Sequence, residues 1–127
     1  GRRERPVAFA AAVERLATFA RPEVEVILGL PGDTPEGFRQ TVRFVLDLPA
    51  AVSVYRLRLD PWSRFLERRA GLGLEADFAD MGRIRATPTF PPEALADAEA
   101  WLEGLAQGPW FHRARGLSYD GRELVRP

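Results

Sequence analysis

The stretch VEVILGLPGDTPEGF, residues 24–38, sets the fold of this 127-residue chain. Its first five residues are mostly apolar and β-branched, which predicts a short strand over 24–28. A turn with two glycines and a proline follows. Thr34 then suits the N-cap of a helix, with Pro35 and Glu36 in the first turn. Because ligands of strand–turn–helix units bind at the carboxyl end of the strand, we interpret the turn as the lip of a site.

Helices and strands alternate along the rest of the chain. Apolar spacing and turn residues predict helices over 6–20, 34–48 and 92–106, a short helix that ends near Gly71, and a second strand over 51–59. Asp120-Gly121 between apolar residues predicts a small terminal hairpin. Alternation of this kind favours right-handed crossovers, a parallel sheet and the α/β fold class.

Alternation within the two strands assigns their faces. The first strand has Val24, Val26 and Leu28 on one face and Glu25, Ile27 and Gly29 on the other. The second has Tyr55, Leu57 and Leu59 on one face and Val52, Val54, Arg56 and Arg58 on the other. We expect the bulky sets, Val24 to Leu28 and Tyr55 to Leu59, to meet the helices, which leaves the charged residues opposite them. Charges on a sheet face need partners. Glu25 and one arginine therefore form a structural ion pair, or Arg56 or Arg58 binds an anionic substrate group.

Composition excludes several classes of site. Acidic and basic residues number 18 each and are interspersed, so the chain lacks the positive patch that nucleic acid or an anionic membrane surface attracts. It has no run of the roughly 20 apolar residues that a membrane-spanning helix needs, and we expect a cytoplasmic location. Without cysteine or lysine, this chain provides no disulfide, thiolate ligand or Schiff-base lysine.

Several motifs, in this order, resemble a known family. Residues 24–38 with Thr41 resemble the fifth-strand segment of radical S-adenosylmethionine (radical SAM) enzymes, particularly the cobalamin-domain and coproporphyrinogen-oxidase-like groups. Residues 6–16 resemble the preceding barrel helix, 52–59 the sixth strand, 65–73 the helix that follows, and TPTFPPEAL (87–95) the segment after the barrel. The resemblance covers roughly residues 5–105. It implies the C-terminal portion of a partial (β/α) barrel, with two or more parallel strands, flanking helices and a helical extension.

The resemblance also implies a cofactor wall around the first strand. In such enzymes the residue at Ile27 approaches the adenine of S-adenosylmethionine, and the glycine at Gly29 leaves room for it. Leu30 and Pro31 continue the same wall. These residue types suit a flat ring, which favours apolar contact and a backbone without a side chain in the way. Arg56 and Arg58 are the candidates for binding the substrate.

The chain departs from the family pattern in three places. Glu25 stands where some members have glycine, residues 60–63 replace a common Pro-Gly-Thr turn, and the cysteine triad that holds the [4Fe-4S] cluster is absent. Without the cluster the sulfonium is not cleaved, because the electron has no source. We therefore expect a C-terminal fragment of a radical SAM oxidoreductase, transferase or cyclase that is inactive alone. The parent protein would bind S-adenosylmethionine, the [4Fe-4S] cluster and, in some relatives, cobalamin. A degenerate relative that only binds is the alternative.

This interpretation divides the chain and names its partners. Residues 1–74 would form the barrel units, and residues 75–127 an extension packed on them. The partner would be the missing N-terminal half of the barrel, and unpaired strand edges favour self-association of this chain. Other hypotheses stay open: a non-catalytic nucleotide-binding or protein-interaction domain of α/β type, a hydrolase that uses Asp33, Asp60 and His112, or a domain that binds partners through Trp62, Trp101 and Trp110.

Overall fold

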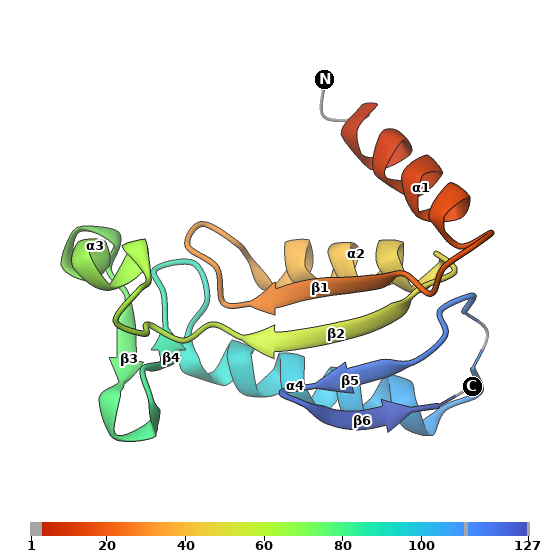
Figure 1. The fold of residues 1–127 in the computed structure, drawn as a ribbon. Coiled ribbons are helices and arrows are strands. Elements are labelled where there is room, and N and C mark those ends of the chain that lie inside the picture. The colour runs from red at the N-terminus through yellow and green to blue at the C-terminus, as the bar shows by residue number, and fades with distance from the viewer. Residues whose placement is uncertain (1–3, 111, 127) are drawn as a thin grey trace.

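A computed structural model describes residues 4–110 and 112–126, which form an α/β domain (Figure 1). Within these residues the order is α1 (Glu4–Leu16), β1 (Glu23–Leu28), α2 (Pro35–Leu46), β2 (Ala51–Arg56), α3 (Arg64–Leu72), β3 (Glu75–Asp77), a 3-10 turn η1 (Phe78–Asp80), β4 (Arg83–Ala86), α4 (Pro92–Gln107), β5 (Leu117–Tyr119) and β6 (Arg122–Val125). The expected alternation of helices and strands is confirmed. The short β3–β4 hairpin between α3 and α4 is an addition that the sequence pattern does not reveal.

Four strands form one mixed sheet in the order β1-β2-β5-β6 (Figure 1). β1 and β5 both run parallel to β2, and β6 returns antiparallel to β5. The predicted terminal hairpin is confirmed, because Asp120 and Gly121 both have positive φ, the conformation that a two-residue hairpin turn of type I′ requires. The tail thus supplies a third parallel strand beside β2, which the sequence did not predict.

Local sequence signals begin and end the helices. Thr34 caps α2, where its hydroxyl accepts a hydrogen bond from the backbone N–H of Gly37 at 3.0 Å. Ser63 caps α3 in the same way through the N–H of Phe65. Gly73 ends α3 in the left-handed conformation, with φ of 67°, that favours glycine at this position.

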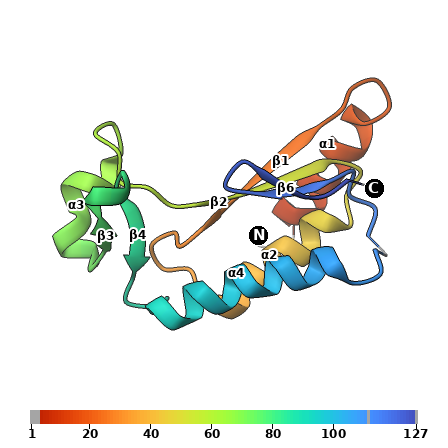
Figure 2. The same ribbon diagram turned by 90° about the horizontal axis from the view of Figure 1, so that it is seen from below.

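Helices α2 and α4 cover one face of the sheet (Figure 2). Between them and the strands lies the core, whose fully buried side chains include Leu28, Val52, Val54, Phe38, Val42, Leu46, Leu95, Leu102 and Leu117. Each large apolar side chain removed from water in this way contributes about 1.5–3 kcal/mol. In the part of the chain that the structure describes, no helix covers the opposite face of the sheet. The sheet is therefore packed on one side only.

The predicted faces are confirmed for β1 and wrong for β2 (Ala51–Arg56), whereas Leu57 and Leu59, which follow the strand, are buried in the core as expected. Val24 pairs with Val52 and Leu28 with Arg56 in the parallel register, so the side chains of each pair lie on the same face. Val52 and Val54 are buried beneath the helices, and Arg56 lies on that face too. Tyr55, expected to meet the helices, lies beside Ile27 on the open face. Strand register therefore overrides side-chain size in deciding which face of β2 is buried.

A small unit continues from the carboxyl end of β2 (Figure 1). The N–H of Ile84 donates to the carbonyl oxygen of Leu57, and the N–H of Leu59 donates to the carbonyl oxygen of Gly82. The β3–β4 hairpin is therefore hydrogen-bonded to residues 57–59, which directly follow β2. This unit and α4 contribute to the same core as β1 and β2. Both sides of the boundary expected at residues 74 and 75 thus share one core, and the two-part division stays a prediction. Among the described residues, no helix has the length and apolar character to cross a membrane.

Gly29 provides a test of the packing where β1 meets the turn. It has φ of +95°, and a Cβ there would lie 2.8 Å from Cγ2 of the buried Ile84. We expect Gly29→Ala to lower the free energy of unfolding by about 2–4 kcal/mol, from backbone strain plus the clash. Gly32→Ala is the matched control, because Gly32 has φ of +84° but no neighbour within 4 Å, and it should cost only about 1 kcal/mol. Equal losses in urea unfolding would show that Ile84 does not restrict this position.

Candidate functional site

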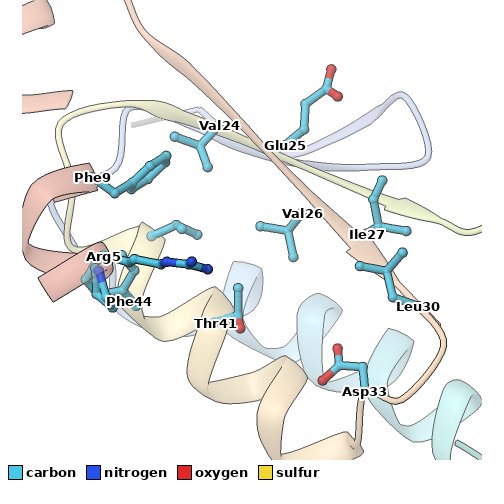
Figure 3. Close-up of a pocket in the computed structure, with 12 residues that line it drawn as sticks. Arg5, Phe9, Val24, Glu25, Val26, Ile27, Leu30, Asp33, Thr41 and Phe44 are labelled. Carbon is cyan, nitrogen blue, oxygen red and sulfur yellow. The ribbon is translucent and has the colours of Figure 1, made fainter. Parts of the chain in front are cut away.

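A groove of about 510 Å³ follows the outer edge of β1 (Figure 3). The consecutive residues Val24, Glu25, Val26 and Ile27 all line it, together with residues of α1, α2 and the turn after β1. Successive side chains of a strand point to opposite faces of the sheet. A groove that touches both sets must run along the edge of the strand.

The backbone groups of β1 alternate in the direction they face. The carbonyl oxygens of Pro22 and Leu28 accept hydrogen bonds from the N–H groups of Ala51 and Leu57 respectively. The backbone groups of the even-numbered residues of β1 therefore face β2. In a parallel ladder the intervening residues turn their N–H and C=O groups to the other side. Glu23, Glu25 and Ile27 therefore present these groups at the outer edge of β1. No strand pairs with that edge within residues 4–110 and 112–126.

The groove combines an apolar floor with charges at its margins (Figure 3). Phe9 of α1 and Phe44 of α2 lie with ring centroids 6.4 Å apart and are 44% and 36% exposed, which is high for rings beside a core. Glu25 points away from this floor, toward the open face of the sheet, while Arg5 points into the groove. Asp33 lies at the end where β1 leads into the turn.

The four residues expected to form a cofactor wall are only partly brought together. Ile27 and Leu30 line the groove, Pro31 is half-buried in the turn, and Gly29 is buried. The positive φ of Gly29 breaks the strand alternation, and the space beside it is filled by Ile84 and Leu95. Gly29 thus makes room for core side chains in this structure. The role of Ile27, Leu30 and Pro31 beside an adenine stays a prediction.

Side chains of the turn already occupy the amino end of α2. Thr34 accepts from the N–H of Gly37, and the Asp33 carboxylate accepts from the N–H of Thr34 at 2.9 Å. The backbone carbonyl oxygen of Asp33 accepts from the hydroxyl of Thr89 at 2.5 Å, which ties the turn to the segment before α4. A phosphate here would meet a carboxylate and compete with existing bonds. This geometry disfavours the nucleotide-binding alternative.

Arg56 belongs to a polar network at the carboxyl ends of β2 and β5. Its side chain is 12% exposed, and it donates from Nη1 to Glu99 at 3.1 Å and from Nε to the carbonyl oxygen of Ile84 at 2.9 Å. Arg83 binds the other carboxylate oxygen of Glu99 at 2.8 Å and the Asp120 carboxylate at 3.2 Å. The network therefore ties α4 to three separate segments of β structure. The expected ion pair of Glu25 with one arginine is wrong, because Arg56 lies on the helix-covered face and pairs there with Glu99.

Tyr119 completes the network from β5. Its hydroxyl donates to Glu99 at 2.6 Å and accepts from Arg83 at 3.2 Å. Burial, together with the hydrogen bond to the Glu99 carboxylate, raises the pKa of Tyr119 well above its ordinary value. The tyrosine therefore stays protonated at neutral pH and acts as a fixed donor.

Arg58 has different surroundings from Arg56. It is 37% exposed and pairs with Asp80 of η1, through the carboxylate at 3.5 Å and the carbonyl oxygen at 2.8 Å. Neither arginine lines the groove beside β1. The structure thus separates the two predicted substrate-binding residues from Ile27 and Leu30, and a role for either in binding substrate stays a prediction.

The residues of the other open hypotheses have ordinary surroundings. His112 lies against the ring of Trp110 and 3.4 Å from the Asp47 carboxylate, on the surface beside the end of α2. Trp101 packs edge-on against Phe38, whereas Trp62 is exposed. Within the described part of the chain, no group of three or more His, Cys, Asp or Glu side chains could hold a metal ion.

Comparisons with known proteins do not assign a family. No family model, no curated protein and no solved structure matches the chain.

The two arginines offer a test of the structural interpretation. We expect Arg56→Ala to lower the free energy of unfolding by about 2–4 kcal/mol, because the partly buried Oε1 atom of Glu99 and the carbonyl oxygen of Ile84 both lose their hydrogen bonds from Arg56. Arg58→Ala removes a more exposed pair and should cost about 1 kcal/mol or less. Urea unfolding of the two variants measures the difference. A neutral Arg56→Ala variant would contradict the structural role.

Proposed function

We propose that this chain is the C-terminal part of a radical SAM-type barrel, where it contributes one wall of the cavity for S-adenosylmethionine and substrate. The single observation that carries the proposal is the one-sided sheet, with helices on one face and none on the other in the described residues (Figure 2). Parallel strands are normally covered on both faces. A sheet of this kind suits the wall of a barrel, whose inner face meets further strands or a ligand.

Ile27 and Tyr55 would form the contact surface of that wall. They are neighbours in the β1–β2 register and both are half-buried on the open face. An aliphatic side chain beside an aromatic ring suits the flat adenine of S-adenosylmethionine. Leu30 and Pro31 would extend the wall at its rim. When bound, S-adenosylmethionine supplies the methyl or adenosyl group for the chemistry.

The [4Fe-4S] cluster does not fit this chain. The sequence has no cysteine, which leaves no thiolate to hold the iron. In the proposal the cluster and its ligands belong to other parts of the parent protein, as does cobalamin if the parent binds it. This chain alone would therefore help to bind and orient S-adenosylmethionine and the substrate, and it would not start the reaction.

The groove beside β1 favours a second candidate, a protein-interaction domain. An unpaired strand edge next to exposed aromatic rings is a typical site for an added polypeptide strand. This candidate needs neither S-adenosylmethionine nor a cluster. The two candidates are separated by their ligands, a sulfonium nucleoside for one and a polypeptide for the other.

Calorimetry with S-adenosylmethionine tests the first candidate. In the protein encoded by the complete reading frame, we expect Ile27→Glu to raise the Kd for S-adenosylmethionine at least about tenfold, or 1.4 kcal/mol, because a charge replaces the apolar contact. Val7→Glu is the matched control, since Val7 is 70% exposed on α1 and lies outside the proposed wall. The chain alone should take up no cluster when incubated anaerobically with iron and sulfide. A stoichiometric cluster in this chain, or an unchanged Kd for Ile27→Glu, would contradict the proposal.

A further inference from the structure

We infer that the β1 groove binds an extended polypeptide segment that joins the sheet as a new strand, with apolar side chains on its helix-facing side and basic side chains on its open-face side. The inference deepens the protein-interaction candidate and rests on it. It does not depend on a cofactor. Three observations carry it: the backbone groups at the edge, the apolar floor and the charges beside the strand.

The backbone groups at the edge define how the segment binds. Glu23, Glu25 and Ile27 turn their N–H and C=O groups outward along one line, as shown above for the β1–β2 ladder. A segment in extended conformation satisfies these groups with main-chain hydrogen bonds whatever its sequence. The edge has no proline, and no register irregularity interrupts the pairing of β1 with β2, so it lacks two common devices that block strand addition.

The floor of the groove selects every second side chain of the segment. Residues pointing to the helix side of the sheet would enter the space bounded by Phe9, Phe44 and Val26. Both rings are substantially exposed, although they border the core. Covering apolar surface contributes about 25 cal/mol for each Å² removed from water. Apolar residues are therefore preferred at these alternate positions.

Acidic side chains select the other half of the segment. Glu23 and Glu25 are exposed on the open face, and Glu25 points away from the floor (Figure 3). Residues of an added strand directly opposite them lie within reach of the carboxylates. Asp33 adds a third negative charge at the carboxyl end of β1, whereas Arg5 lies on the helix side. Basic residues on the open-face side of the segment complement this pattern.

The same charges disfavour a second copy of the chain as the occupant. An antiparallel pair of β1 strands centred on Glu25 places that residue opposite its own copy, and one centred on Val24 places Glu23 opposite Glu25. Like charges directly opposite each other on neighbouring strands are destabilising. In these two registers, association through two β1 edges, one form of the self-association expected from the sequence, therefore carries a penalty that a basic segment avoids.

Two synthetic peptides test the inference with this chain. One alternates arginine and valine over eight residues, the other alternates glutamate and valine, and binding is measured by calorimetry and amide chemical shifts without S-adenosylmethionine. We expect the basic peptide to bind at least about fivefold more tightly than the acidic one. The shifts should concentrate at Glu23, Glu25 and Ile27. Equal affinities, or shifts located elsewhere, would overturn the inference.

Two variants separate strand pairing from simple charge attraction. Ile27→Pro removes an N–H that faces the outer edge, where proline is tolerated in a strand, and should weaken binding about tenfold while the amide spectrum stays dispersed. Glu25→Arg should reverse the preference between the two peptides. Glu36→Arg on the exposed first turn of α2 changes the net charge by the same amount as Glu25→Arg. This control variant should still prefer the basic peptide.

The outcomes distinguish this inference from the cofactor proposal. Loss of the peptide preference in Glu25→Arg but not in Glu36→Arg supports the edge as the site, even if the Ile27→Pro variant does not fold. Failure of both peptides to bind, or a dimer with protected β1 amides, overturns the inference. Both of these results would leave the Kd for S-adenosylmethionine, and with it the cofactor proposal, unaffected.

Discussion

The pairing of β2 on both of its edges is the constraint on which the rest of the structure depends. β1 joins one edge and β5, more than sixty residues later, joins the other. This register turns Val52, Val54 and Arg56 toward α2 and α4, so the core and the start of the polar network share one face. It also leaves β1 as an outer strand, where the backbone N–H and C=O groups of Glu23, Glu25 and Ile27 face the unpaired edge.

The network around Glu99 holds this arrangement at the carboxyl ends of the strands. The Glu99 carboxylate on α4 accepts hydrogen bonds from Arg56 of β2, Arg83 of β4 and Tyr119 of β5. Beside the end of β5, the Asp120 carboxylate accepts a hydrogen bond from the backbone N–H of Arg56. These are partly buried charge-assisted hydrogen bonds, which are stronger and more directional than exposed ion pairs. A charged cluster at this end of a parallel sheet is thus structural here. The surfaces left for function are the open face around Ile27 and Tyr55 and the edge of β1.

Local signals predicted much of the fold, and long-range pairings account for what they missed. Thr34 and Asp120-Gly121 marked the start of α2 and the terminal hairpin, because caps and two-residue turns depend on neighbouring residues. The parallel pairing of Leu117 to Tyr119 with β2 left no local pattern, since three residues carry no period. The sequence placed Tyr55 on the helix-covered face of β2 because its side chain is large, whereas the register with β1 puts it on the open face. Glu99 was missed as the partner of Arg56 because 43 residues separate them. Of the candidate site, Ile27 and Leu30 were identified, whereas the groove needs Phe9 and Phe44 from two helices.

Amide hydrogen exchange along β1 tests the central claim, that this strand has one paired side and one unpaired side. In the chain without added peptide, at low concentration, the N–H groups of Val24, Val26 and Leu28 donate to β2 and should exchange slowly. Those of Glu23, Glu25 and Ile27 face the outer edge and should exchange roughly 100-fold faster, equivalent to about 3 kcal/mol of local opening free energy. This alternation is the result that the account predicts. Uniformly slow exchange across all six amides would contradict it, because another strand would already occupy the edge.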